Sequence, residues 1–278
     1  MKSRVLDAMN AQYLSADNAV ESGSWFFTAS RRRDVEIEDG KRVELLIFDA
    51  EPGMVDGKLG DGDNVIINIM LKKGAELSLV HVVTRDSVSD INIDVCEDAQ
   101  CSVTEVVLGP SRLNVVSSLV GANARFNLNG LFVLTDNQRG NVTVDVNHAH
   151  ADATSRTQFK GIASGTAKGS FSGMILVEAD AQRTLAEQIS RNVVLNDAEI
   201  KTEPQLEIYA DDVKCSHGAT VGQLDGEAIL YMRQRGLSLE DAKRLQVEGF
   251  VSDVVMHSAI ERLSEPLQLL LSEKLKEL

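Results

Sequence analysis

A short unit that recurs along the middle of the chain constrains its fold more than any other feature. Each copy has a turn residue, a small residue and then apolar residues at alternate positions, as in the copies that start at Gly74, Asp98, Gly121 and Asp197, with weaker copies at Gly140, Gly165 and Asp180. The starts at 74, 98, 121 and 140 lie 24, 23 and 19 residues apart. A drifting period of this size is typical of a β-solenoid, because each coil buries its apolar face only by stacking on the next coil.

The segments between these turns have the pattern of short strands. Apolar residues alternate with polar ones in residues 77–83 and 91–95, and Gly and Asp clusters separate the segments. No sustained 3.6-residue period occurs between Thr28 and Glu207. The pattern therefore predicts a mainly β protein, a parallel β-helix. An immunoglobulin-like sandwich is the alternative, since it also has short strands and regularly spaced turns.

The pattern changes after Asp225 and becomes helical. Asp225 and Ser238 can cap helices, and Gly236 and Gly249 can end them. Two further helices are expected around apolar positions that share a helical face, namely Val251, Val254, Val255 and Ala259 and, after Pro266, Leu267, Leu270, Leu271 and Leu275. The end of the chain is thus expected to be a small helical domain.

These patterns divide the chain into three parts. Residues 1–27 are an N-terminal segment, in which Val5, Met9 and Tyr13 suggest one helix. Residues 28–224 are the β-helix core, and residues 225–278 are the C-terminal helical domain.

Composition and charge exclude several classes of partner. The formal net charge is −14, and the one basic run, Arg31 to Arg33, is followed at once by Asp34 and Glu36. Nucleic-acid binding requires a clustered basic surface, so we expect no nucleic-acid partner. Aromatic residues make up only 4% of the chain, which argues against a groove of stacking platforms for sugars or bases.

The chain has the features of a cytoplasmic protein that does not enter a membrane. No stretch approaches the ~20 apolar residues of a membrane span, and the N-terminus has no apolar signal-peptide core. Three cysteines, Cys96, Cys101 and Cys215, do not form a disulfide framework, so we expect reduced thiols.

One short motif could carry chemistry. Cys215 and His217 are two residues apart, which on a strand places a thiol and an imidazole on the same face. Both side chains bind soft or borderline metals, but a closed zinc site or an iron-sulfur cluster needs about four ligands, so a second chain would have to contribute. A purely structural thiol beside a hydrogen-bonded histidine remains the other interpretation.

Other candidates are weaker. His148 and His150 have the same spacing and could be half of a metal site, although structural roles fit them as well. His81 lies on an apolar face and is expected in the core, and His257 falls within a helix. The chain has no Gly-x-Ser-x-Gly elbow, Walker loop or Gly-x-Gly-x-x-Gly motif, so no enzyme is predicted.

Residues 144–255 contain a series of distinctive motifs, namely His148-Ala149-His150, Phe159-Lys160-Gly161, Asp180-Ala181-Gln182-Arg183-Thr184, Pro204 to Asp212, the stretch around Cys215-Ser216-His217, and Arg235-Gly236-Leu237. Together they resemble the SufB/SufD family of iron-sulfur cluster assembly scaffold proteins. The resemblance implies a right-handed parallel β-helix followed by a helical C-terminal domain, the same architecture that the residue pattern predicts.

The resemblance also implies partners and a site. Such a scaffold pairs with itself or with a SufB-like protein, binds a SufC-type ABC ATPase on its helical domain, and receives sulfur indirectly from a SufE/SufU-type donor or a desulfurase. A transient iron-sulfur cluster would form at the dimer interface, with His217 as the residue that matches the family's histidine ligand and Cys215 beside it. These two residues are the expected cofactor and metal ligands.

The sequence also departs from the family pattern. The position of the SufB cysteine falls near Arg191, where there is no thiol, so the chain is SufD-like. Its portion before the β region is shorter than is usual in the family, which makes it compact. Two alternatives stay open: a purely structural SufD-like partner of the ATPase that does not ligate the cluster, and a β-helical carbohydrate-active enzyme, against which Trp25 as the only tryptophan speaks.

Overall fold

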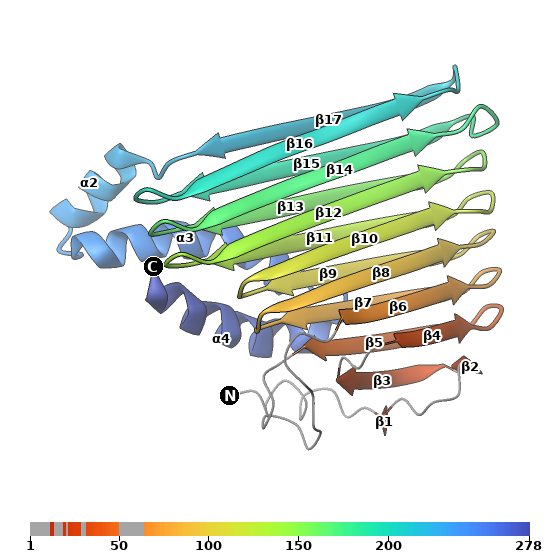
Figure 1. The fold of residues 1–278 in the computed structure, drawn as a ribbon, viewed down its shortest axis with the longest axis horizontal. Coiled ribbons are helices and arrows are strands. Elements are labelled where there is room, and N and C mark those ends of the chain that lie inside the picture. Colours follow the sequence, from red (N-terminus) through yellow and green to blue (C-terminus); the bar gives the residue numbers. More distant parts are fainter. Residues whose placement is uncertain (1–11, 14–18, 21, 29–31, 50–63) are drawn as a thin grey trace.

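The computed structural model describes residues 12–13, 19–20, 22–28, 32–49 and 64–278, and they form a flattened solenoid of two parallel sheets (Figure 1). Sheet A has nine strands in the order β1 (Gln12–Tyr13), β3 (Gly23–Thr28), β5 (Arg42–Asp49), β7 (Glu76–Val83), β9 (Gln100–Val107), β11 (Arg125–Leu134), β13 (Thr154–Ala163), β15 (Thr184–Val194) and β17 (Val213–Gly222). Sheet B has eight, in the order β16 (Glu199–Ile208), β14 (Lys168–Val177), β12 (Arg139–His148), β10 (Ser111–Leu119), β8 (Ser87–Val95), β6 (Asn64–Leu71), β4 (Arg32–Ile37) and β2 (Ala19–Val20).

Each coil contributes one strand to each sheet, and neighbouring strands pair in parallel, as β7 does with β9 and β8 with β10. The predicted parallel β-helix is therefore confirmed. The immunoglobulin-like alternative is wrong, because sandwich sheets are built from antiparallel strands.

The space between the sheets, the lumen, is filled by the inward residues of every strand. Because side chains alternate along a strand, residues in register stack into columns, such as Leu77, Cys101 and Phe126 on β7, β9 and β11. These columns form one apolar core that runs through the coils. The alternation in the sequence thus encodes the inner face of each coil.

The copies that start at Gly74, Asp98 and Gly121 correspond to one corner of the solenoid, and the copy at Asp197 lies at the opposite corner. Gly74, Asp98, Asn123, Asp152 and Arg183, which stand 24, 25, 29 and 31 residues apart, all have positive φ at the first of these corners. Their backbone N–H groups donate to a carbonyl of the following coil, as Gly74 N does to Glu97 O at 2.9 Å and Asp98 N to Ala122 O at 2.9 Å. We call this row the turn ladder. In its first four members a buried alanine follows, namely Ala75, Ala99, Ala124 and Ala153.

Several copies lie at positions that differ from those expected from the sequence. The third turn residue is Asn123 rather than Gly121, which lacks a side chain because a Cβ would come within 2.0 Å of Glu97 N. Gly140 lies inside β12, and Gly165 belongs to a turn at the opposite corner. The sequence pattern did not distinguish the turns at the two corners, because both corners use similar turn residues.

Three α-helices and two short 3₁₀ helices follow the last coil: α2 (Gly226–Gln234), α3 (Leu239–Met256), η1 (Glu261–Leu263), α4 (Ser264–Lys274) and η2 (Leu275–Glu277). Asp225 and Ser238 cap α2 and α3 as expected. Gly249 does not end a helix: α3 continues through it, because its buried residues on both sides keep the helix packed. Pro266 lies inside the first turn of α4, where no intrahelical N–H bond is lost.

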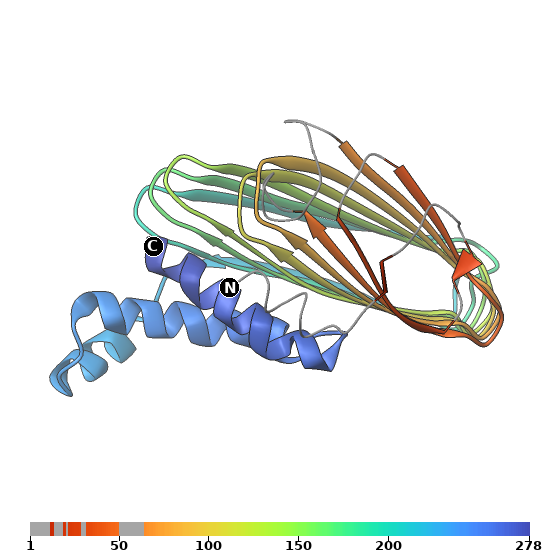
Figure 2. The same ribbon diagram turned by 90° about the horizontal axis from the view of Figure 1, so that it is seen from below.

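Helices α3 and α4 cover the outer face of sheet A (Figure 2). Apolar outward residues of the sheet, among them Leu46, Val80, Val106, Leu131 and Ile162, form a second core with apolar residues of the helices. Lys160, which is 6% exposed, donates to Asp253 Oδ1 at 2.7 Å and to Phe250 O at 2.7 Å. The helical region is therefore packed against the solenoid rather than separate from it.

The described part of the N-terminal segment is β structure. Tyr13 lies in β1, and β2 and the start of β3 also fall within residues 1–27. The predicted helix was thus wrong at these positions, and residues 1–11 and 14–18 lie outside the described residues. Among the helices that the structure describes, none is both long and apolar enough to cross a membrane.

Candidate functional site at the open end of the solenoid

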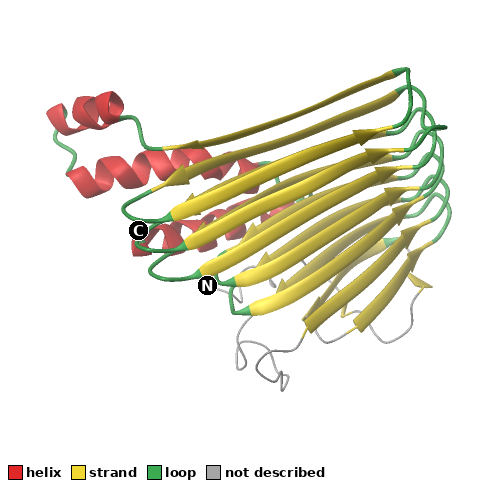
Figure 3. Cartoon of the chain, turned by 45° about the horizontal axis from the view of Figure 1, so that its top comes forward, coloured by secondary structure: helices red, strands yellow, loops and turns green. Residues whose placement is uncertain are grey.

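Cys215 and His217 lie on β17, the last strand of sheet A, which is labelled in Figure 1. Figure 3 shows how the strands of the two sheets stack toward this end. Among the described residues, β17 pairs only with β15, and β16, the last strand of sheet B, pairs only with β14. One backbone edge of each strand is therefore unpaired within this part of the chain. We call this end, with β16 and β17, the open end.

The two predicted ligands share the inner face of β17. Cys215 is in register with Ala186, and His217 is in register with Gln188, both of which are buried in the lumen. Since no further coil of the described chain stacks on β17, Cys215 is only half-buried and His217 is exposed. The structure thus places a thiol and an imidazole side by side where a second molecule can reach them.

The environment of the Cys215 thiol favours its protonated form. Partial burial raises its pKa, and a hydrogen bond with the Ala186 backbone opposes this effect only in part. The side chain packs beside the small buried cluster of Ile175, Val177, Ala181, Ala186 and Ala210. Binding a metal ion here would therefore require loss of a proton.

The lumen below the pair is polar, which the sequence interpretation missed. Gln188, directly below His217 in its column, is fully buried and its Nε2 donates to Val144 O at 3.2 Å. The missing side chain of Gly173 makes room for this amide, because a Cβ there would lie 2.4 Å from Gln188 Nε2. Asn192 Nδ2 donates to Ser190 Oγ at 3.0 Å and to Thr220 O at 3.1 Å.

The sequence contains a signal for the polar lumen below Cys215 and His217. Polar residues occupy alternate positions of β15, at Thr184, Gln188, Ser190 and Asn192, where earlier coils have mainly apolar residues. A shallow depression of about 310 Å³ at the same end is lined by both His217 and Arg191, the residue near which the sequence comparison expects the cysteine of a SufB protein.

The structure does not bring His148 and His150 together as a ligand pair. His148 is the last residue of β12 and is buried, with its Nε2 2.8 Å from Ser155 Oγ, and burial lowers its pKa to about 4. His150 lies past the end of the strand and is exposed. The same-face geometry predicted for an i, i+2 pair is lost because the strand ends between them.

The remaining candidates have other environments. His81 is a core residue, as expected, and lies 2.8 Å from Glu105 Oε2. His257 is exposed at the C-terminal end of α3. Cys96, Cys101 and Cys215 are all free, and burial raises the pKa of the Cys101 thiol. Within the described residues, no three His, Cys, Asp or Glu side chains are grouped so that they could hold a metal ion.

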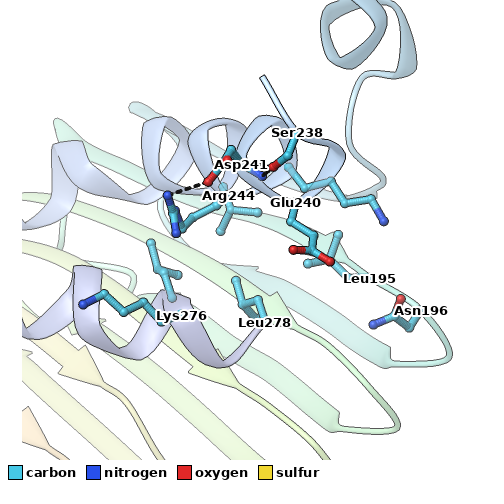
Figure 4. Close-up of a pocket in the computed structure, with 11 residues that line it drawn as sticks. Leu195, Asn196, Ser238, Glu240, Asp241, Arg244, Lys276 and Leu278 are labelled. Atoms are coloured by element: carbon cyan, nitrogen blue, oxygen red, sulfur yellow. Dashed lines mark hydrogen bonds and ion pairs between the residues drawn. The ribbon is translucent and has the colours of Figure 1, made fainter. Parts of the chain in front are cut away.

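A second pocket lies between the helices and the solenoid (Figure 4). Its volume is about 390 Å³, and it is lined by Leu195 and Asn196 of the β15–β16 turn, by the start of α3 and by the end of the chain up to Leu278. At its rim, Ser238 caps α3 and Arg244 Nη2 lies 2.8 Å from Asp241 Oδ1. The pocket thus lies beside the start of α3 and the end of the chain.

Fold and site together define a class: a two-sheet parallel solenoid with helices packed on one sheet and a Cys-x-His pair at an open end. A family model described as "SUF system FeS cluster assembly, SufBD core domain" matches residues 21–250. The chain belongs to this SufB/SufD family, as the resemblance of residues 144–255 predicted.

Curated relatives agree with the family assignment. The iron-sulfur cluster assembly protein SufD of Escherichia coli is 30% identical over 237 residues, which cover 82% of this chain and 54% of that protein. An iron-sulfur cluster assembly SufBD family protein of Synechocystis is 44% identical over 114 residues (41% of this chain, 25% of that protein), and the chloroplastic protein ABCI7 of Arabidopsis thaliana is 28% identical over 230 residues (77% and 48%). The chain thus spans about half the length of the Escherichia coli and Arabidopsis proteins, and its match covers a quarter of the Synechocystis protein.

Proposed function

We propose that this chain is a SufD-like scaffold subunit of a SUF-type iron-sulfur cluster assembly complex, with a binding role and no catalytic site of its own. The observation that carries the proposal is the position of Cys215 and His217 on the inner face of the last coil, at an end where both sheets have free edges. Membership of the SufB/SufD family supports it. The expected compartment is the cytoplasm, although one relative is chloroplastic by name.

The open end is the proposed pairing surface. Unpaired strand edges are templates for a second chain, and the inner residues of β16, which a further coil would bury, are only partly covered: Ile200, Thr202, Pro204, Leu206 and Ile208. A second copy of this chain or a SufB-like protein would cover these residues and extend both sheets.

The iron-sulfur cluster is the cargo of this interface. Cys215 offers a sulfur ligand and His217 a nitrogen ligand, and the paired chain would supply the remaining ligands of a cluster that usually needs four. Because the thiol must lose its proton, we expect cluster binding to strengthen as the pH rises. Sulfur would come from a SufE/SufU-type protein or a desulfurase by way of the paired chain.

The helical region is the proposed docking site of a SufC-type ABC ATPase. Helix α2 buries none of its residues, and large apolar side chains are exposed on α2 and α3, namely Leu230, Tyr231, Leu239, Leu245 and Met256. Exposed large apolar side chains on a helical region suit a protein interaction surface. The pocket between α3 and the end of the chain adjoins the same region.

Anaerobic reconstitution with ferrous iron and sulfide tests the cluster site. The complex with a SufB-like protein and the ATPase would be compared for wild type, His217→Ala, Cys215→Ser and the double variant, with Ser216→Ala as a control on the opposite face of the same strand. We expect a strong loss of cluster absorbance in His217→Ala and a smaller loss in Cys215→Ser. Wild-type cluster yield in the double variant would leave only the purely structural role as partner of the ATPase.

Co-purification tests the docking site. The double variant Leu230→Ser/Tyr231→Ser should lose the ATPase while it keeps pairing at the open end, measured by light scattering. Gln234→Ala on the same helix serves as the control. Normal ATPase binding by the double variant would place the docking site elsewhere.

A further inference from the structure

Four ionisable side chains lie buried inside the solenoid, several coils away from the open end. Asp49, His81 and Glu105 point into the lumen from the adjacent strands β5, β7 and β9, and Arg85 enters from the turn between β7 and β8. Arg85 is 7% exposed and the other three are 0% exposed. The site proposed for cluster assembly uses none of them.

These side chains form two ion pairs that lie next to each other. His81 Nδ1 is 2.8 Å from Glu105 Oε2, and Arg85 Nε donates to Asp49 Oδ1. His81 is in register with Ile47, and Asp49 is two residues further along β5 on the same inward face. The two pairs are therefore diagonal neighbours.

Several buried polar atoms of these four side chains, and of serines near the corner from which Arg85 enters, have no hydrogen-bond partner among the described residues. They are Asp49 Oδ2, His81 Nε2, Arg85 Nη2, Glu105 Oε1 and the hydroxyl oxygens of Ser87, Ser89 and Ser111. Ser87 and Ser111 are in register on β8 and β10, at the corner from which Arg85 enters. A buried polar atom without a partner costs about 1–3 kcal/mol, so ordered water is the expected partner at a polar site of this kind.

We propose that Asp49, His81, Arg85 and Glu105 form a hydrated ion cluster inside the first coils, neutral only while His81 carries a proton, which makes the stability of these coils depend on pH. Two carboxylates balance one guanidinium and one imidazolium. Loss of the proton leaves one unbalanced negative charge in a medium of low dielectric constant, where such a charge is costly.

The sign of the pH dependence follows from the surroundings of His81. Burial by itself lowers the pKa of His81, but the charge and hydrogen bond of Glu105, with the charge of Asp49, outweigh burial and raise it above its ordinary value. The buried serines near the corner from which Arg85 enters, Ser87, Ser89 and Ser111, carry no charge. The stabilisation is therefore fully present below the ordinary histidine pKa of about 6.5 and is lost as the pH rises through the raised pKa.

Side-chain NMR of protein labelled with ¹⁵N-histidine tests the protonation directly, because the chain has only five histidines. At pH 7.5, His81 should show two protonated ring nitrogens. His148, which is buried without a carboxylate partner among the described residues, should show one. A neutral His81 ring at pH 6 would overturn the proposal.

Thermal unfolding between pH 6 and pH 9 tests the consequence. The double variant His81→Leu/Glu105→Met replaces one ion pair by apolar side chains, so it remains foldable where a single variant would leave a buried charge. The difference in Tm, wild type minus double variant, should fall by about 4 °C or more from pH 6 to pH 9. The difference between wild type and His148→Gln should stay constant from pH 7 to pH 9, and a constant difference for the double variant would contradict the proposal.

A high-resolution crystal structure tests the hydration. Ordered water should lie within hydrogen-bond distance of Ser87 Oγ and Arg85 Nη2. A dry cluster would overturn this part of the proposal.

Discussion

Strands β9 and β17 belong to the same sheet but have opposite surroundings. The second half of β9 is buried on both faces, by the lumen on one side and by α3 and α4 on the other. β17 has a similar alternation of apolar residues on its inner face, yet its residues are half-buried or exposed. The difference teaches that an alternating strand identifies an inner face, whereas only its neighbours decide whether that face belongs to the core or to an interface.

Deletion of residues 226–278 tests the outer cover of β9 and has the largest expected effect. It would expose the outward apolar residues of sheet A, each of which contributes about 1.5–3 kcal/mol when buried. We expect loss of soluble, monodisperse protein, measured by size-exclusion chromatography and dye binding.

Deletion of the α2 residues 226–234 is the matched control, because α2 contributes no buried residue. This shorter deletion should leave the solenoid folded. A folded and monomeric protein without residues 226–278 would show that the helices are not part of the core.

The burial of His148 in the lumen should make the free energy of unfolding depend on pH, by roughly 3 kcal/mol at most. The effect arises because its pKa is about 4 in the folded chain and about 6.5 in the unfolded chain. Because the unfolded chain binds more protons between these values, stability should fall as the pH drops from 6.5 to 4. In His148→Gln, which cannot titrate, chemical unfolding should show a smaller loss over this range. Parallel profiles of the two proteins would contradict the prediction.

Alanine substitutions at Gly130 on β11 and at Gly218 on β17 compare the packing of the closed coils with that of the open end. A Cβ at Gly130 would lie 2.2 Å from the Phe159 ring, whereas a Cβ at Gly218 meets nothing within 4 Å. Gly130→Ala should therefore cost about 1–3 kcal/mol, and Gly218→Ala should be close to neutral in the isolated chain. Equal melting temperatures of the two variants would show that the lumen adapts more freely than its packing indicates.

Lys160→Met tests the polar contact between sheet A and α3. It removes the bonds to Asp253 and Phe250 O, but Asp253 is half exposed and can be solvated, so we expect a loss of about 1 kcal/mol. Lys201→Met on the exposed outer side of β16 is the control and should change stability by less than about 0.5 kcal/mol. A Lys160→Met variant as stable as the control would show that this contact does not help to hold α3 on sheet A.

The sequence predicted the coils well because each coil repeats the same local physics. Turn residues, buried alanines and alternating strands are all nearest-neighbour features, and so are the caps at Asp225 and Ser238. The placement of Cys215 and His217 on one face followed from the same alternation.

Features that depend on contacts across the fold were not predicted. The pairing of His81 with Glu105, 24 residues apart, and of Arg85 with Asp49, 36 residues apart, depends on the register between coils. The cover of sheet A by helices had one overlooked signal: β7 loses its alternation after Leu79 and continues as a buried run through Val83. A strand that is apolar on both faces requires a layer on each side.

The turn ladder has a consequence for how such chains can change in length over evolution. Each rung takes its hydrogen bond from the coil that follows, so an insertion of a few residues at this corner would break the row, whereas insertion of a whole coil would renew it. Large changes in length should therefore come as whole coils, which here are 24 to 31 residues long, while smaller changes lengthen single coils away from this corner. Homologues of very different size can then share the same ends and differ only in the number of coils between them.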